Sequence, residues 1–139
     1  MAVVTSIMRV QQVLLSRVEA ILRPLGLTFA RYEVLMLLRF SRAGSLPVGK
    51  IGERLQVHPA SVTNAVQRLE QDGFVVRSVN PADSRSVLAE ITASGRQVTK
   101  QATARLNDDV FSAVPISAAE QREVYSTLKA MRRAFGDFS

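Results

Sequence analysis

Residues 51–90, IGERLQVHPASVTNAVQRLEQDGFVVRSVNPADSRSVLAE, decide the fold of this chain. Within them, residues 59–72 predict a helix, because apolar side chains recur there at three- and four-residue spacing. These apolar positions are Val62, Ala65, Val66 and Leu69. A shorter helix over residues 48–55 precedes it, and two β-branched runs, residues 74–79 and 87–91, follow it as a hairpin. The stretch therefore predicts a helix-turn-helix with a hairpin attached.

The face of the 59–72 helix opposite the apolar stripe is polar but nearly uncharged. It carries Ala60, Asn64, Gln67 and Gln71, flanked by Ser61, Thr63 and Arg68. Asparagine, serine and threonine are weak helix formers, so their cluster in mid-helix needs a reason other than helix propensity. Recognition of DNA supplies one, because amides and hydroxyls exchange hydrogen bonds with base edges in the major groove without needing charge. A merely solvated polar face is the alternative that this helix leaves open.

The hairpin is expected to carry a long polar tip over residues 80–86 (NPADSRS), with Asp83 and Arg85 on it. An arginine on an exposed hairpin beside a helix-turn-helix can reach the minor groove, where negative potential is concentrated in narrow segments. Asp83 is close enough in sequence to orient Arg85 by a charge-assisted hydrogen bond. The alternative is a solvated pair of turn residues.

Long apolar stripes mark the predicted helices at both ends of the chain. Residues 3–22 predict one amphipathic helix, with Val4, Ile7 and Met8 among its apolar positions. Residues 92–114 predict another, and a capping box at residues 117–120 (SAAE) starts the last one. The stripe of that last helix is Val124, Leu128, Met131, Phe135 and Phe138. These surfaces are wider than one small domain can cover, so we expect them to pack against a second copy of the chain.

The chain has the length of one domain, 139 residues, and the pattern predicts a mainly α fold with six helices and a small β-hairpin. Residues 28–40 are apolar nearly all round, which predicts a central helix capped by Thr28. Residues 41–47 are expected to form a loop. We assign residues 28–92 to the helix-turn-helix module, and residues 1–25 and 93–139 to dimerisation.

Composition argues against several classes of function. The chain has no cysteine, which excludes a disulfide framework, a thiol nucleophile and a thiol redox switch. Its one histidine, His58, excludes a multi-histidine metal site, and we expect neither a metal nor a cofactor. The chain lacks a G-x-S-x-G motif and a carboxylate pair suited to a cleft, so we do not expect an enzyme. Without a membrane-length apolar run or a signal-peptide cleavage site, we expect a cytoplasmic protein with no membrane partner.

The net charge of +6 suits a polyanionic partner such as double-stranded DNA. Residues 1–42 hold six basic and two acidic residues, residues 43–100 hold seven and five, and residues 101–139 hold five and five. Residues 43–100, which contain the predicted helix-turn-helix and hairpin, are therefore only mildly basic. A helix-turn-helix that binds a protein partner and no DNA is accordingly a second candidate.

Three strings of the chain resemble the MarR family of bacterial transcription regulators. Residues 27–38 (LTFARYEVLMLL) are similar to the second-helix signature of the family. Residues 57–77 (VHPASVTNAVQRLEQDGFVVR) look like its recognition helix and first wing strand. Residues 80–95 (NPADSRSVLAEITASG) look like its wing, with the D-x-R element at Asp83 and Arg85. The resemblance covers essentially the whole chain, although the terminal helices match only by length and pattern.

The resemblance implies a winged helix-turn-helix in each subunit of a homodimer, intertwined through the N- and C-terminal helices. It further implies a repressor that binds a pseudo-palindromic operator and is released by a small aromatic or phenolic effector. The interface residues expected for the dimer are Val4, Ile7, Met8, Val124, Leu128, Met131 and Phe135. The loose candidates for contact with the effector are Arg17, Tyr32 and His58.

The resemblance also assigns residues to the DNA surface. The recognition-helix contact positions hold Ser61, Thr63, Asn64, Gln67 and Arg68, and the wing tip holds Arg85 with Asp83 beside it. We expect Asn64 and Gln67 to contact bases, and Lys50, Ser61 and Arg68 to contact phosphates. The chain departs from the family pattern at Asn64, where many members have arginine, at Ser84, which replaces a frequent wing arginine, and at the cap residue His58. A base preference different from that of other members is therefore expected.

Overall fold

The computed structural model describes residues 1–137. Within them the chain forms six α-helices and a three-stranded sheet. The helices are α1 (Ala2–Leu22), α2 (Phe29–Phe40), α3 (Val48–Leu55), α4 (Pro59–Gln71), α5 (Ala93–Leu106) and α6 (Ala118–Ala134). The strands are β1 (Ser45–Pro47), β2 (Val75–Asn80) and β3 (Asp83–Ile91). The predicted mainly α fold with a small hairpin wing is confirmed. Phe138, the last position of the predicted C-terminal apolar stripe, lies outside the described residues.

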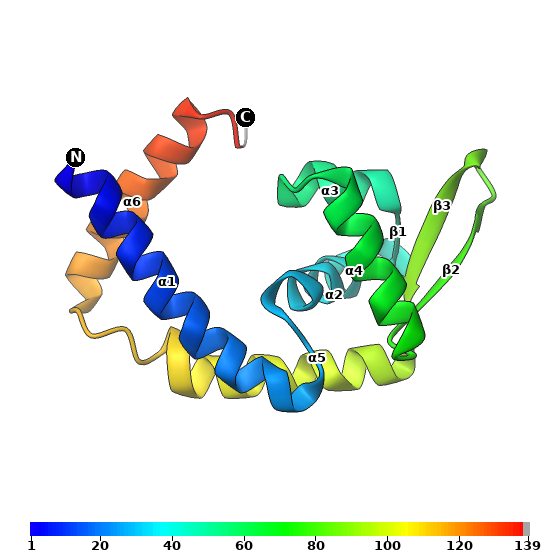
Figure 1. Ribbon diagram of the computed structural model, residues 1–139, viewed down its shortest axis with the longest axis horizontal. Helices are drawn as coiled ribbons and strands as arrows, with labels where there is room; N and C mark the ends of the chain where they lie inside the picture. The colour runs from blue at the N-terminus through cyan, green and yellow to red at the C-terminus, as the bar shows by residue number, and fades with distance from the viewer. Residues whose placement is uncertain (138–139) are drawn as a thin grey trace.

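The helices divide between the two ends of the molecule (Figure 1). At one end α3, α4 and the β2–β3 hairpin project from the central helix α2, whereas α1 and α6 lie together at the other end. α5 runs between the two ends and packs on both α1 and α2. Helices α3 and α4 and the hairpin thus lie at the end opposite α1 and α6, while α1 and α5 both contact α2. None of the described helices combines the length and the apolarity that crossing a membrane requires.

Side-chain caps set the starts of several helices, as their sequences predict. The hydroxyl of Thr28 accepts a hydrogen bond from the backbone N–H of Arg31 at the start of α2. The ring nitrogen Nδ1 of His58 accepts one from Ala60 at the start of α4, over 3.1 Å. Ser117 and Glu120 form the expected capping box of α6. These bonds satisfy backbone donors that have no partner within their own helix.

One strand was not predicted, and another is longer than predicted. Residues 45–47 were expected to lie in a loop, but they form β1 and pair with β3 in the order β1-β3-β2. Three residues are too few to show the alternation of apolar and polar side chains by which a strand is predicted. The hairpin tip expected over residues 80–86 is also wrong, because β2 continues to Asn80 and β3 begins at Asp83.

Side chains at the tip tighten this hairpin. Nδ2 of Asn80 donates to Oγ of Ser86 over 2.9 Å, and Oδ1 of Asn80 accepts from the backbone N–H of Ala82. The turn between the strands is therefore reduced to Pro81 and Ala82. Asn80 pairs with Asp83 after a register shift that leaves the wing irregular at its tip.

The third departure concerns the helix predicted over residues 92–114. It is α-helical only to Leu106 and continues as a wider π-helical turn, η3 (Asn107–Phe111). There the backbone N–H of Ser112 bonds to the carbonyl of Asn107, five residues earlier.

The core lies around α2, which contacts α1, α3, α4, α5 and the sheet. Its residues Leu35 and Leu38 are fully buried, together with Ile51 of α3 and Leu69 of α4. The base of the wing is fixed to α5 at Gly95, where an added Cβ would come within 2.2 Å of the Phe74 carbonyl oxygen. A side chain at position 95 would therefore separate α5 from the start of β2. This packing holds the wing at a defined place beside α4.

Candidate nucleic-acid interface

Helix α4 lies on the surface of the molecule beside the wing (Figure 1). Val62, Val66 and Leu69 are buried against the core, which turns the opposite face of the helix to solvent. The side chains predicted for DNA contact on this helix are all exposed: Ser61, Thr63, Asn64, Gln67 and Arg68. We call this set of five residues the reading face.

The amides of the reading face are free. Within the described part of the chain, the side chains of Asn64 and Gln67 have no hydrogen-bond partner. The hydroxyl of Thr63 donates to the carbonyl of Pro59 over 3.0 Å and keeps its acceptor capacity. Asn64 and Gln67 can therefore present both donors and acceptors to base edges without first breaking bonds within the protein.

The charged candidates have partners of their own. Arg68 Nε lies 3.3 Å from a carboxylate oxygen of Asp72. Lys50 Nζ, on α3, lies 3.0 Å from Oε2 of Glu53. The Lys50–Glu53 pair is substantially exposed, so a phosphate can replace its carboxylate at little cost, whereas in the other pair Arg68 is 60% exposed and Asp72 only 27%. Arg54 on α3 is a further exposed cation, and the sequence pattern gave no reason to select it.

The wing presents Arg85 to solvent near its tip. Asp83 does accept a hydrogen bond from Arg85, but the donor is the backbone N–H, over 3.0 Å, and the guanidinium has no hydrogen bond to Asp83 among the described residues. The expected orientation of the Arg85 side chain by Asp83 is therefore wrong. Asp83 shapes the backbone of the tip instead, because an aspartate that bonds two residues ahead forms a local turn. The guanidinium of Arg85 is left free to reach outward.

Glu70 and Arg77 tie the reading helix to the wing. Oε1 of Glu70 accepts from Nη2 of Arg77 on β2 over 2.9 Å and from its Nε over 3.1 Å, while Oε2 accepts from its backbone N–H. The hydrogen bond from the Arg77 side chain holds the pKa of the Glu70 carboxyl below its usual value. These three bonds between one residue of α4 and one of β2 hold the helix and the wing together, because hydrogen bonds to a charged group are stronger than neutral ones.

Replacing Glu70 with glutamine is expected to destabilise the fold near neutral pH and to have little effect in acid. A carboxyl whose pKa is lowered on folding stabilises the native state above its unfolded pKa, and this stabilisation is lost as the pH falls through the folded value. Urea unfolding of both proteins at about pH 7 and about pH 3 measures the difference. Glu90→Gln, the same change on exposed β3 without an ion pair among the described residues, is the control. A Glu70→Gln deficit that is equal at the two pH values would contradict the assignment.

Arg31 and Asp72, an ion pair whose carboxylate also contacts Arg68 of the reading face, were not predicted from the sequence. Arg31 of α2 lies 3.7 Å from the same Asp72 oxygen that Arg68 contacts. The spacing of Arg68 and Asp72, one helical turn apart, could have indicated their pair. Nothing local in the sequence indicates Arg31, because it lies on another helix.

The three candidates for effector contact lie on different elements. Tyr32 is buried in α2, and its hydroxyl shares a 2.8 Å hydrogen bond with that of Thr103 on α5. Arg17 is exposed on α1, and His58 is exposed at the start of α4. None of the three is among the residues that line the cavities described in residues 1–137. Their contact with an effector stays a prediction.

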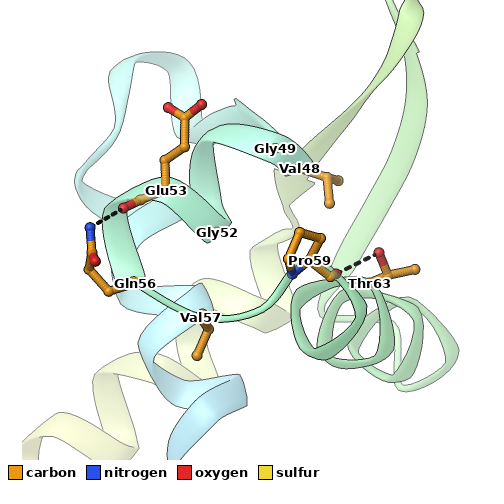
Figure 2. A pocket seen from close by; sticks show the side chains of 8 residues that line it. All are labelled: Val48, Gly49, Gly52, Glu53, Gln56, Val57, Pro59 and Thr63. Atoms are coloured by element: carbon orange, nitrogen blue, oxygen red, sulfur yellow. Dashed lines mark hydrogen bonds between the residues drawn. The ribbon is translucent and has the colours of Figure 1, made fainter.

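A cavity of about 670 Å³ opens between α3 and the start of α4 (Figure 2). Its lining consists of Val48, Gly49, Gly52, Glu53, Gln56, Val57, Pro59 and Thr63. Val57 and Pro59 are the two neighbours of His58 in the chain, so this histidine lies at the margin of the cavity. The volume is within the range of small-molecule sites.

The predicted dimerisation helices leave apolar side chains uncovered. Val4 and Met8 on α1 are 57% and 60% exposed, and Val124 and Phe135 at α6 are 48% and 84% exposed. Ile7 and Leu128 line an apolar groove of about 530 Å³ between α1, η3 and α6. Met131 is half-buried, and no residue of α6 is buried among those described. A helix with this composition is stable in water only if its apolar face is covered.

The fold and the exposed reading face agree with comparisons to known proteins. Residues 27–87 match the model of the MarR family. The HTH-type transcriptional repressor Rv2887 of Mycobacterium tuberculosis is 32% identical over 124 residues, which are 88% of this chain and 88% of that protein. The chain belongs to the MarR family. As a member it is a DNA-binding transcription regulator rather than an enzyme.

Solved structures of MarR-family proteins share its fold. Sco5413, a MarR family regulator from Streptomyces coelicolor, is 50% identical, with a TM-score of 0.90 over 99% of this chain and 96% of that one. A MarR mutant from E. coli, complexed with operator DNA, is 26% identical, with a TM-score of 0.86 over 94% of each chain. The resemblance inferred from the three sequence strings is thus confirmed for the fold of the whole chain.

Proposed function

We propose that this MarR-family protein is a repressor that binds a pseudo-palindromic operator as a homodimer. The free and exposed amides of Asn64 and Gln67 are the observation that carries the proposal. Polar groups without partners on a helix whose other face is packed into the core suit the major groove. The Rv2887 protein, which is called a transcriptional repressor, supports repression as the mode of control.

In this proposal Asn64 and Gln67 contact base edges. Thr63, on the same exposed face of α4, also contacts the DNA. Lys50 on α3 and Ser61 and Arg68 on α4 position the module on the DNA, because cations and hydroxyls hydrogen-bond to the phosphates of the DNA backbone. Two copies of α4 enter successive major grooves about 10 bp apart. Arg85 enters the flanking minor groove from the wing.

The homodimer is proposed from the apolar surface of α1 and α6. Val4, Ile7 and Met8 on one side and Val124, Leu128, Met131 and Phe135 on the other form its interface. A second copy of the same helices can cover this surface, because a two-fold axis brings identical stripes together. The intertwining of the terminal helices would hold the two reading faces at one spacing.

Control by a small aromatic or phenolic effector is the second part of the proposal. An effector bound beside α3 and α4 would shift the distance between the two reading faces, and a rigid dimer fits only one half-site spacing well. The cavity at the margin of His58 supports a site there, whereas Arg17 and Tyr32 are proposed from their helices alone.

A reporter gene placed behind the DNA upstream of the protein's own gene tests repression. We expect low expression when the protein is supplied and high expression when it is absent. A double variant, Asn64→Ala with Gln67→Ala, should restore expression at an equal protein level. Expression that rises when the wild-type protein is supplied would contradict repression and indicate an activator.

Replacing Arg85 with alanine is expected to weaken operator binding by about tenfold, because a narrow minor groove attracts a guanidinium strongly. The loss should be largest when the flanks of the operator are A·T-rich. Fluorescence anisotropy on two duplexes that differ only in A·T-rich or G·C-rich flanks measures it. Arg85→Lys is the matched variant, since it keeps the positive charge and loses the planar guanidinium group. Unchanged affinity on the A·T-rich duplex would rule out the minor-groove role.

A further inference from the structure

One carboxylate, that of Asp72, faces two arginines from two helices. Its Oδ2 atom lies 3.3 Å from Nε of Arg68 on α4 and 3.7 Å from Nη1 of Arg31 on α2. The side chains of Arg31 and Asp72 are mostly covered, at 18% and 27% exposure, whereas that of Arg68 is 60% exposed. Two cations and one anion leave this cluster with a net positive charge that the protein does not neutralise there.

The same two arginines line an open hollow of about 360 Å³ between the start of α2 and the side of α4. The rest of its lining is Thr28, Ala30, Ser61, Asn64 and Ala65. No acidic residue lines this hollow within the described residues, and Ser61 and Asn64 add a hydroxyl and an amide. Since Asn64 also belongs to the reading face, the hollow lies at the edge of the proposed DNA surface.

Arg31 is held in position by the protein itself. Its Nε donates to the hydroxyl of Thr28 over 3.1 Å, and its Nη1 donates to the backbone carbonyl of Gly26 over 3.1 Å. The guanidinium therefore has a fixed plane and keeps N–H donors for an additional acceptor. A fixed guanidinium beside an exposed second arginine suits a phosphate group.

We propose that the hollow seats one phosphate of the DNA backbone in each subunit, and that Asp72 is a built-in competitor of this phosphate. The inference rests on the DNA-binding function proposed above. In the free protein Asp72 forms ion pairs with both arginines. On DNA a phosphate oxygen takes the place of Asp72 at the exposed Arg68, while Arg31 stays anchored on Thr28 and Gly26.

A phosphate contact carries no sequence information, so the competitor acts on every duplex alike. Asp72 then lowers the affinity for operator and for other DNA by the same factor and leaves their ratio unchanged. This would keep the regulator from being retained on non-operator DNA.

Anisotropy titrations of a labelled operator duplex and a scrambled duplex, over a series of salt concentrations, test the inference. Asp72→Asn should tighten binding to both duplexes by about tenfold at low salt. The slope of log affinity against log salt should stay near that of the wild type, because the same phosphates are seated in both complexes. Arg31→Gln should weaken binding to both by about tenfold and flatten the slope. The unfolding midpoint of each variant shows whether it is folded.

Asp108→Asn is the matched control, because it removes the same charge from exposed η3. That position lies beyond the end of α5 remote from the wing, and a helix of 14 residues is about 21 Å long, which exceeds a Debye length of about 10 Å. A second control places Asp72→Asn in a protein that also carries Arg31→Gln and Arg68→Gln. In that background Asp72→Asn should add no more than Asp108→Asn does.

The outcomes separate the two proposals. Wild-type binding to the operator with equal effects of Asp72→Asn and Asp108→Asn overturns the phosphate seat alone. So does a gain from Asp72→Asn that persists when both arginines are replaced, because Asp72 would then act by general repulsion. Absence of binding to either duplex by the wild type and by Asp72→Asn overturns the DNA-binding proposal together with the seat.

Discussion

Replacing Leu128 with glutamate should convert the protein into a folded monomer that binds its operator at least about 100-fold more weakly. The second reading face of a dimer binds at the high effective concentration set by the first, and a monomer loses this gain. A carboxylate at Leu128 would be buried without a partner when two copies associate, which costs several kcal/mol. The fold of one chain should tolerate the change, because Leu128 is 36% exposed and lies outside the core.

Sedimentation or light scattering gives the mass of the variant in solution, and anisotropy gives its affinity for the operator. Ser126→Glu is the matched control, since position 126 lies about 200° around α6 from Leu128 and away from the apolar stripe. We expect Ser126→Glu to remain a dimer with wild-type affinity. A dimeric Leu128→Glu protein with full affinity would contradict the proposed interface.

Gln67→Ala should remove discrimination at one base pair in each half-site, by about 1–3 kcal/mol. The Gln67 amide is exposed and has no partner within residues 1–137, so its removal costs the free protein no hydrogen bond. The loss should therefore appear only in the complex and only at the base pair that the amide contacts. Affinity for scrambled DNA should stay the same.

A panel of operator duplexes, each with one base pair changed, measures this effect. Gln71→Ala makes the same chemical change one turn further along, at the C-terminal end of α4. The N-terminal residues of a recognition helix contact the bases, so the C-terminal end lies away from them. Gln71→Ala should preserve the base preference. If Gln67→Ala also preserves the preference at every position, Gln67 does not read a base.

Local sequence signals predict most of the fold. The apolar spacing at Val62, Val66 and Leu69 predicts both the existence of α4 and the face that it buries. Caps are equally local, since Thr28 and Ser117 need only the next few residues to bond. Features that depend on distant partners were missed. β1 exists because β3, some 40 residues later, provides the pairing edge for Ser45 and Pro47.

The reading face shows the same division between local and distant determinants. Its exposure follows from helical periodicity, so the sequence alone places Asn64 and Gln67 correctly on the outside. Whether these amides have hydrogen-bond partners, and whether Arg68 pairs with Asp72, depends on side-chain geometry. The role of Asp83 was predicted wrongly for a related reason, because proximity in sequence does not decide whether a carboxylate bonds a side chain or a backbone N–H. Arg31 could not be predicted at all, since its link to Asp72 is tertiary.

The central claim, that α4 and the wing read a specific DNA sequence, is tested most directly by fluorescence anisotropy with the purified protein. The labelled duplex carries the DNA upstream of the protein's own gene, a scrambled duplex is the control, and both are titrated over a salt series. We expect tight binding to the upstream duplex alone, with log affinity falling linearly and steeply as log salt rises. No binding to either duplex at low salt would contradict the claim and would indicate a winged-helix module that binds a protein partner.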